Sequence, residues 1–266
     1  MQSVESQLIV SSNPDNGALN RTADGSSFEI QLKPELYIPA EAQNISITME
    51  EATIWWSVAN IETGVNDRFY ITGPNVNNVS QNFVIIVQQG LYNLSALNTA
   101  LLRGLENAQA KAGIISLSAD EATQRVVIRF EDVNTSIDFT QPDTCRDILG
   151  FNSRIVGPFV TVPREEIADN VAAFNTVNYF VVHSDLAATG IRVNNVYSQV
   201  LGVVPINVAP RSQIIYTPFN PPRIDSNELR GAKRTNLRFW LTDDRNRLVN
   251  TNSEYWSARV VIRYNI

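Results

Sequence analysis

Thiol and imidazole side chains are almost absent from this chain of 266 residues. Its only cysteine is Cys145, which excludes a disulfide within the chain, and its only histidine is His183. Zinc and most transition-metal sites need several Cys or His ligands, so a metal centre built on either residue type is not expected. The scarcity of cysteine fits a protein that folds in a reducing compartment.

Runs of positive charge and long apolar segments are also missing. The net charge is −6 and the longest basic run is Lys233-Arg234, so nucleic acid is not expected as the main partner. No segment approaches the roughly 18 consecutive apolar residues of a membrane span. Residues 1–24 are polar and lack the apolar core of a secretion signal. We therefore expect neither a membrane-spanning helix nor a secretion signal.

Catalytic patterns are equally scarce. His183 is followed by Ser184 and Asp185, but neighbours on a strand point to opposite faces and do not form a catalytic triad. We interpret His183 as a histidine at the end of a strand, next to a turn, and Cys145 as a buried structural thiol. The acidic pairs lack the spacing of a calcium loop, and no glycine-rich phosphate loop is present. The sequence therefore predicts no enzyme, no cofactor and no metal.

Short strands with alternating apolar residues dominate what is present. Phe28, Ile30 and Leu32 alternate with polar residues, which is typical of a half-buried strand. Residues 44–58 predict a long strand whose apolar positions change phase near Glu50-Glu51, as a β-bulge requires. Further strands are expected at 68–72, 82–87, 114–117, 125–130, 136–139, 176–183, 192–193, 196–204, 213–216, 237–241 and 256–264.

One clear helix interrupts these strands. Apolar residues repeat at helical spacing between residues 95 and 112, with Asn93 or Ser95 as the N-cap and Gly113 as the C-terminal stop. A helical turn is expected over 142–149, closed by Gly150. These elements predict a small α+β module over about 85–155, embedded in a β chain.

The balance of elements predicts an all-β fold, a jelly-roll β-sandwich with a small α+β insertion. Residues 1–26 are rich in turn residues and predict an extended N-terminal arm, whose apolar patch is Leu8-Ile9-Val10. Such an arm orders on a neighbouring molecule when it cannot bury itself locally. Residues 27–266 are expected to form the jelly-roll domain and to fold without the arm.

The tandem pair Trp55-Trp56 is the most conspicuous aromatic feature. On a strand, one ring faces the core and the other faces the opposite side. The outward ring is a candidate for burial between subunits or for stacking on a glycan; the alternative is that both rings are buried under a covering arm. The candidate interface residues are Trp55, Trp56, Leu8, Ile9 and Val10.

The C-terminal half carries a more specific pattern. Its segments are His183-Ser184-Asp185-Leu186, Leu201-Gly202-Val203-Val204-Pro205-Ile206, Gln213-Ile214-Ile215-Tyr216, Phe239-Trp240-Leu241-Thr242-Asp243-Asp244, Asn252-Ser253-Glu254-Tyr255-Trp256-Ser257 and Val260-Val261-Ile262. The pattern resembles the closing strands of penton (minor capsid) proteins of virophages, polinton-like viruses and related tailless icosahedral DNA viruses. The Leu-Thr-Asp and Glu-x-Trp segments are its most specific part. The region from Gly90 through the helix to Phe151 also resembles such virion proteins, so that the likeness spans residues 85–266 loosely and leaves 1–26 unmatched.

The resemblance implies a structural virion protein, a single jelly roll of which five copies form a ring at each capsid vertex. The partners it implies are other copies of the chain in a homopentamer and the neighbouring capsomers of the major capsid protein, with a vertex spike or an internal cement protein as further candidates. It implies a location in the virion, after synthesis in the host cytoplasm or a viral factory. The alternatives are a single-jelly-roll major capsid protein, a spike, a carbohydrate-binding β-sandwich or a glycosidase with paired carboxylates.

Overall fold

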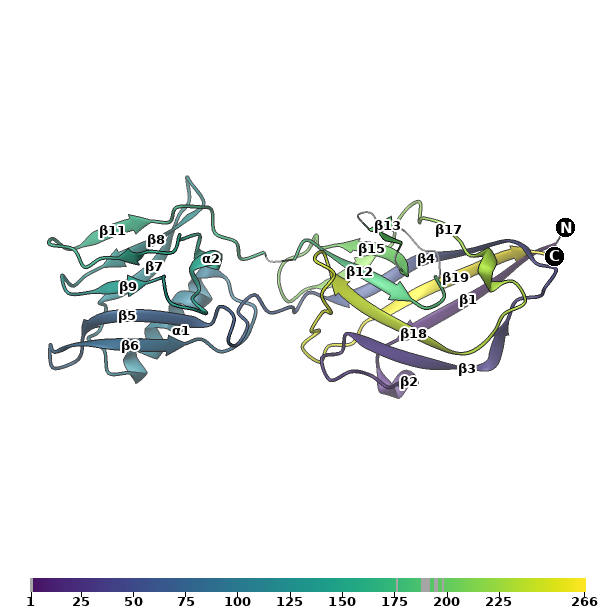
Figure 1. The fold of residues 1–266 in the computed structure, drawn as a ribbon, viewed down its shortest axis with the longest axis horizontal. Coiled ribbons are helices and arrows are strands. Elements are labelled where there is room, and N and C mark those ends of the chain that lie inside the picture. The colour runs from purple at the N-terminus through teal and green to yellow at the C-terminus, as the bar shows by residue number, and fades with distance from the viewer. Residues whose placement is uncertain (1, 176, 188–191, 194–195, 198) are drawn as a thin grey trace. The chain divides into compact units, whose positions relative to one another are not determined.

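The computed structural model describes residues 2–175, 177–187, 192–193, 196–197 and 199–266 (Figure 1). The chain divides into two compact units. Residues 1–58 and 177–266 form unit 1, and residues 59–176 form unit 2, which is inserted between them. Both ends of the chain therefore belong to unit 1, where they lie side by side (Figure 1).

Two antiparallel sheets form the described part of unit 1. Sheet A has the order β1-β19-β4-β16, with β17 also paired to β4, and sheet B has the order β15-β12-β18-β3-β2. Sheet A consists of β1 (Ser3–Ser11), β19 (Ser257–Asn265), β4 (Gln43–Trp55), β16 (Gln213–Tyr216) and β17 (Ile224–Asp225). Sheet B consists of β15 (Val200–Pro205), β12 (Tyr179–Ser184), β18 (Lys233–Asp243), β3 (Ser27–Tyr37) and β2 (Ala18–Leu19).

The described part of unit 1 also contains the strand pair β13 (Arg192–Val193) and β14 (Val196–Tyr197), and 3-10 turns at Pro14–Asn16 and Asn227–Leu229. The arrangement confirms the predicted all-β, jelly-roll-like sandwich.

The core between the sheets is built from alternate residues of each strand. On β4, Ile47 and Met49 are buried before Glu50, and Ala52 and Ile54 are buried after it. The pairing with β19 skips Glu50. The halves of β4 before and after this residue therefore keep their apolar side chains on the same face. The predicted bulge is confirmed, and it lets one long strand line the core along its whole length.

Trp256 joins distant parts of the chain inside this core. Its ring meets that of Phe28 edge to face at 5.0 Å. The indole N–H donates a hydrogen bond to the Gly25 carbonyl at 3.1 Å, and the backbone N–H donates to the Ser12 hydroxyl at 2.9 Å. The tryptophan of the Glu-x-Trp segment therefore holds the N-terminal region against the last strand.

The N-terminal segment is itself part of the sandwich. β1 pairs with β19 along its entire length; Leu8 packs against the core, Val10 is buried in it and Ile9 points outward. This differs from the extended arm expected over residues 1–26. Ser6 interrupts the apolar alternation of β1, so the sequence gives only a weak strand pattern here. The strand forms because β19 offers a partner for its backbone hydrogen bonds.

Unit 2 has its own core. In its described residues one sheet has the order β10-β9-β5-β6 and another the order β11-β8-β7. The first consists of β10 (Ile155–Val156), β9 (Ser136–Asp138), β5 (Arg68–Pro74) and β6 (Ser80–Ile86). The second consists of β11 (Arg164–Ile167), β8 (Arg125–Phe130) and β7 (Ile115–Asp120).

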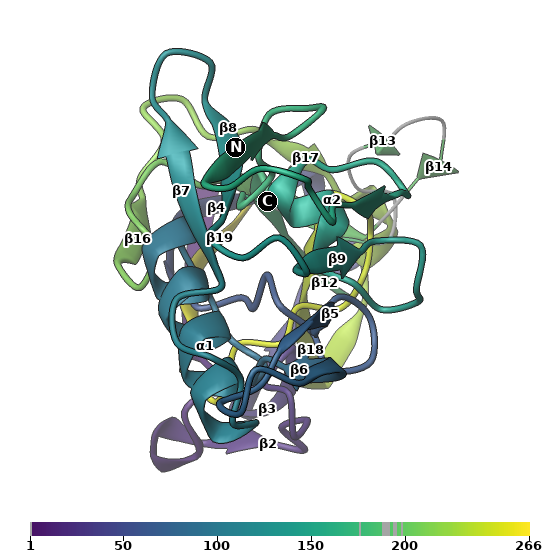
Figure 2. The same cartoon turned by 90° about the vertical axis from the view of Figure 1, so that its left-hand side faces the viewer.

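Helix α1 (Leu94–Asn107) packs beside β6 and β7 and buries Leu97, Leu101 and Leu105 (Figure 2). Asn93 is its N-cap, accepting the Ala96 N–H at 2.8 Å, as predicted. The helix ends before residue 112, because Ala110 is buried and forms a bridge to the β5–β6 turn. The predicted turn is α2 (Arg146–Leu149), and Gly150 follows it in the left-handed conformation.

Unit 2 spans 59–176, a longer range than the module expected over 85–155. Its core includes Phe69 on β5, and β11 extends it beyond residue 155. Asn60 joins the two ends of the unit, donating to the carbonyls of Tyr92 at 2.8 Å and Phe174 at 3.0 Å. These contacts are long-range, which is why local patterns placed the boundaries inside the unit. Neither helix of the described residues is both long and apolar enough to cross a membrane.

Val10→Ala is expected to lower the free energy of unfolding by about 2 kcal/mol, because it removes buried methyl groups from the sandwich core. Ile9→Ala is the matched control at the neighbouring position, which is 81% exposed, and should change stability by less than about 0.5 kcal/mol. Urea unfolding of both variants measures the difference. Equal stability of the two variants would show that β1 does not belong to the core.

Candidate interaction surface

The two tandem tryptophans take different sides of β4. Trp56 faces the core and is 6% exposed, whereas Trp55 is 36% exposed on the outer face of sheet A. The alternation of the strand requires this arrangement, because Ile54 before Trp55 is also buried. Of the two predicted candidates, only Trp55 can contact another molecule.

The N-terminal candidates divide in the same way. Ile9 presents its side chain outward, opposite Arg259 of β19, whereas Leu8 and Val10 face the core. Ile9 and Trp55 thus share the outer face of sheet A, but β19 lies between their strands. The structure places two of the five candidates on one accessible face without bringing them together.

Ion pairs cover the middle of this outer face. Arg263 contacts Glu5 at 2.8 Å and Glu50 at 2.6 Å, and Arg259 contacts Glu50 at 3.5 Å. Val261, between the two arginines on β19, is buried. The charged network links β1, β4 and β19. Ile9 is exposed on the edge strand β1, and Trp55 is exposed on β4 beside the edge strand β16.

Two further exposed residues escaped the sequence analysis. Ile215 on β16 is exposed opposite Thr53, and Phe219 in the following loop is 106% exposed. The loop, residues 217–223, begins after β16 and ends at β17, and both strands pair with β4. The available signal was Pro-Phe-Asn-Pro-Pro at residues 218–222, a phenylalanine between prolines.

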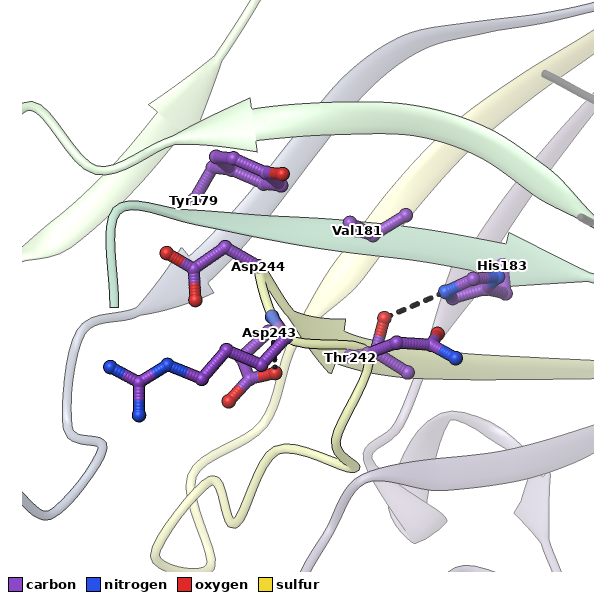
Figure 3. A pocket seen from close by; sticks show the side chains of 8 residues that line it. Tyr179, Val181, His183, Thr242, Asp243 and Asp244 are labelled. Atoms are coloured by element: carbon purple, nitrogen blue, oxygen red, sulfur yellow. Dashed lines mark hydrogen bonds between the residues drawn. The ribbon is translucent and has the colours of Figure 1, made fainter. Parts of the chain in front are cut away.

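A small hollow lies on sheet B, over the outward face of β12. Its volume is about 110 Å³, and Tyr179, Val181 and His183 line it together with the end of β18 and the turn that follows (Figure 3). Besides His183, the hollow contains two acidic residues, Asp243 and Asp244, which are candidates for acid–base chemistry.

Both carboxylates hold backbone in place. Asp243 accepts hydrogen bonds from the backbone N–H groups of Arg245 and Arg247 at 2.9 and 2.8 Å, and from the Arg247 side chain at 2.8 Å. Asp244 accepts the backbone and side-chain N–H groups of Asn178 at 3.1 and 2.7 Å. This geometry stabilises the turn that the sequence predicted here and joins it to the start of β12.

The histidine is buried and serves packing. His183 Nε2 and the Thr242 hydroxyl form a hydrogen bond of 2.8 Å, and the imidazole stacks on Trp240 at 5.1 Å. Ser184 projects from the other face of the strand, where its hydroxyl accepts a backbone N–H, and Asp185 accepts a backbone N–H from β18. The three consecutive residues do not form a catalytic triad. His183 lies near the end of its strand as expected, but inside the protein rather than at an exposed turn.

The thiol is also structural. Cys145 is buried and donates to the Asn66 carbonyl at 3.1 Å. Burial, with a smaller contribution from the charge of Asp67, raises the pKa of the thiol and keeps it protonated. Across the residues that the structure describes, no three His, Cys, Asp or Glu side chains gather as a set of metal ligands.

Comparison with known proteins supplies a likeness of fold. No protein-family model matches the sequence, and no curated protein matches it. Among solved structures, the crystal structure of the mavirus penton protein is similar, with a TM-score of 0.51 and 12% sequence identity. The alignment covers 99% of this chain and 100% of that one. The likeness therefore extends over the whole chain and concerns the fold.

His183 is expected to make the protein less stable in acid. Burial lowers the pKa of its imidazole from 6.5 to about 4. Between these pH values the unfolded chain binds a proton that the folded chain does not. The free energy of unfolding is therefore unaffected by this group above pH 6.5 and decreases as the pH falls towards about 4. The loss attributable to His183 is on the order of 3 kcal/mol. Urea unfolding at about pH 7 and about pH 4.5 should show a smaller acid loss for His183→Gln than for the native chain. An identical acid loss in both proteins would contradict the assignment.

Proposed function

We propose that this chain is a structural virion protein, a penton that forms a pentameric ring at the vertices of an icosahedral capsid. The observation that carries the proposal is the likeness of fold to the mavirus penton protein, which covers nearly the full length of both chains. A likeness restricted to the sandwich would support only a jelly-roll protein, because this architecture serves many functions. The match includes the inserted unit 2.

The residues of the C-terminal pattern support the same proposal as parts of a scaffold. Trp256 anchors the core, Thr242 binds the buried His183, and Asp243 closes the turn after β18. The indole N–H of Trp256, the hydroxyl of Thr242 and the carboxylate of Asp243 each make a contact within the fold, and we propose a structural role and no enzymatic activity. The sequence pattern and the fold point to the same class of protein through different observations.

The partners follow from this role. The chain would bind further copies of itself in a homopentamer and would contact neighbouring capsomers of the major capsid protein, with a vertex spike or an internal cement protein as additional partners. A ring requires a heterologous interface, in which two different patches of the same chain meet. Sheet A offers exposed apolar side chains at both of its edges, Ile9 on β1 and Ile215 on β16. The proposed location is the vertex of the virion.

The purified protein is expected to form five-membered rings, with a mass five times the 29.7 kDa of the chain. Light scattering across a concentration series gives the mass, and negative-stain images of the largest species give the symmetry. A stable trimer would contradict the proposal and would instead favour a single-jelly-roll major capsid protein or a spike.

A further inference from the structure

The edge strands of unit 2 differ in how they are protected from other strands. An open edge exposes unpaired backbone N–H and C=O groups, which natural proteins cover or flank with charge or proline. Helix α1 covers β7, where the Asn98 side chain accepts the outward N–H of Leu117 at 2.8 Å, and three of the four residues of β11 are charged. Strand β6 has seven residues, none charged and none proline, and the whole segment 69–102 lacks Asp, Glu, Lys and Arg. Within the described part of the chain β6 ends its sheet, so its outer edge is open (Figure 1).

Every second residue of β6 directs its backbone polar groups to this open edge. The Val87 N–H, just after the strand, donates to the Asp67 carbonyl at 2.7 Å, and hydrogen-bonded and non-hydrogen-bonded pairs alternate from there along β6 and β5. The N–H and C=O groups of Val84 and Ile86 therefore point away from β5. Their side chains are 52% and 64% exposed, so an apolar surface accompanies the free backbone groups.

The opposite edge of the same sheet has a matching residue on β10. The Phe139 N–H donates to the Arg154 carbonyl at 3.0 Å, which makes this a hydrogen-bonded pair of β9 and β10. The next residue, Ile155, therefore turns its N–H and C=O away from β9. Its side chain is 57% exposed. Each edge of the sheet thus combines free backbone groups with an exposed aliphatic side chain.

One row of residues across the sheet joins the two edges. Val84 lies opposite Tyr70 on β5, and Ile155 lies opposite Asp138 on β9. The register of β5 with β9 continues this row by placing Tyr70 beside Asp138. Side chains that lie directly opposite each other share a face of the sheet, so Val84 and Ile155 are on the same face and at the same level. Because the four strands alternate in direction, β6 and β10 run in opposite directions.

We propose that β6 of one copy pairs with β10 of the next copy, so that this sheet of unit 2 continues from chain to chain around the ring. The inference rests on the proposed ring function and identifies a contact that would form it. Val84 and Ile155 then become a directly opposite, hydrogen-bonded pair, and Ile86 packs diagonally on Ile155.

A second copy is the occupant that fits these two edges. Antiparallel pairing needs edges that run in opposite directions and expose backbone groups at the same level, and β6 and β10 of identical chains meet both conditions. The apolar side chains at the two edges also lie on one face, where they can cover each other. Rotation about an axis parallel to the strands brings the two different edges together head to tail, which is the kind of contact that closes a ring.

The first test places a charge on the open edge. Val84→Lys should lower the fraction of chains in rings by at least about tenfold at a fixed protein concentration, because a lysine on an edge strand opposes the addition of another strand. Its unfolding midpoint in urea should not change, since the side chain is half exposed. Val133→Lys is the matched control, because Val133 is 43% exposed and lies between β8 and β9. An unchanged ring fraction for Val84→Lys would overturn the inference.

The second test locates the contact. The double variant Val84→Cys/Ile155→Cys is treated with a bismaleimide shorter than three strand spacings, about 14 Å, so that the two edges of one sheet cannot be joined within a chain. The buried Cys145 does not compete. The expected product is a ladder of covalent oligomers whose cross-linked peptides contain positions 84 and 155.

The two single cysteine variants are the controls for this ladder, and neither should be cross-linked. Dimers formed by Val84→Cys alone would show that two β6 edges meet each other, which would contradict the head-to-tail contact. A double variant that gives no ladder would refute the interface.

The two tests separate the inference from the proposed function. Five-membered rings without the 84–155 cross-link would leave the penton proposal intact and refute this interface. A ladder that closes at another ring size would support the interface and refute the pentamer. The absence of both rings and ladder would refute both.

Discussion

The last strand of the chain determines whether sheet A exists. β19 lies between β1 and β4, which come from the first quarter of the sequence, and hydrogen-bonds to both. Trp256, just before it, binds Ser12 and Gly25 and packs on Phe28. The sandwich can therefore close only when residues 257–265 are available to pair with β1 and β4. This long-range pairing also explains how a separate unit of 118 residues, 59–176, can be inserted without interrupting the core.

The same pairing decides what the surface offers to other molecules. Once β1 and β4 are in register with β19, every second side chain must enter the core, and the residues between them face outward. Leu8, Val10 and Trp56 are thereby committed to the fold, whereas Ile9 and Trp55 are left on the outer face. Ion pairs between β1, β4 and β19 occupy the middle of that face, whereas Ile9 and Ile215 are exposed on its two edge strands.

The polar residues that resemble catalytic groups contribute to the architecture instead. A buried imidazole needs a hydrogen-bond partner, and His183 has Thr242 as well as the ring of Trp240. The carboxylate of Asp243 accepts hydrogen bonds from backbone N–H groups of its turn that would otherwise bind water. The residues that carry the resemblance to penton proteins are thus residues that the sandwich needs, which explains why a sequence pattern could point to the fold before any interface was visible.

The sequence by itself determined the local features: the half-buried strands, the bulge at Glu50, the N-cap at Asn93 and the scarcity of catalytic and metal-binding groups. These depend on neighbouring residues and on composition, which are present before folding. Only the tertiary structure decided that residues 3–11 form a strand, that unit 2 extends over 59–176, that His183 is buried and that Phe219 stands fully exposed. Pairing and burial join residues that are far apart in the chain, so their outcome depends on which distant partner fits and not on the local pattern.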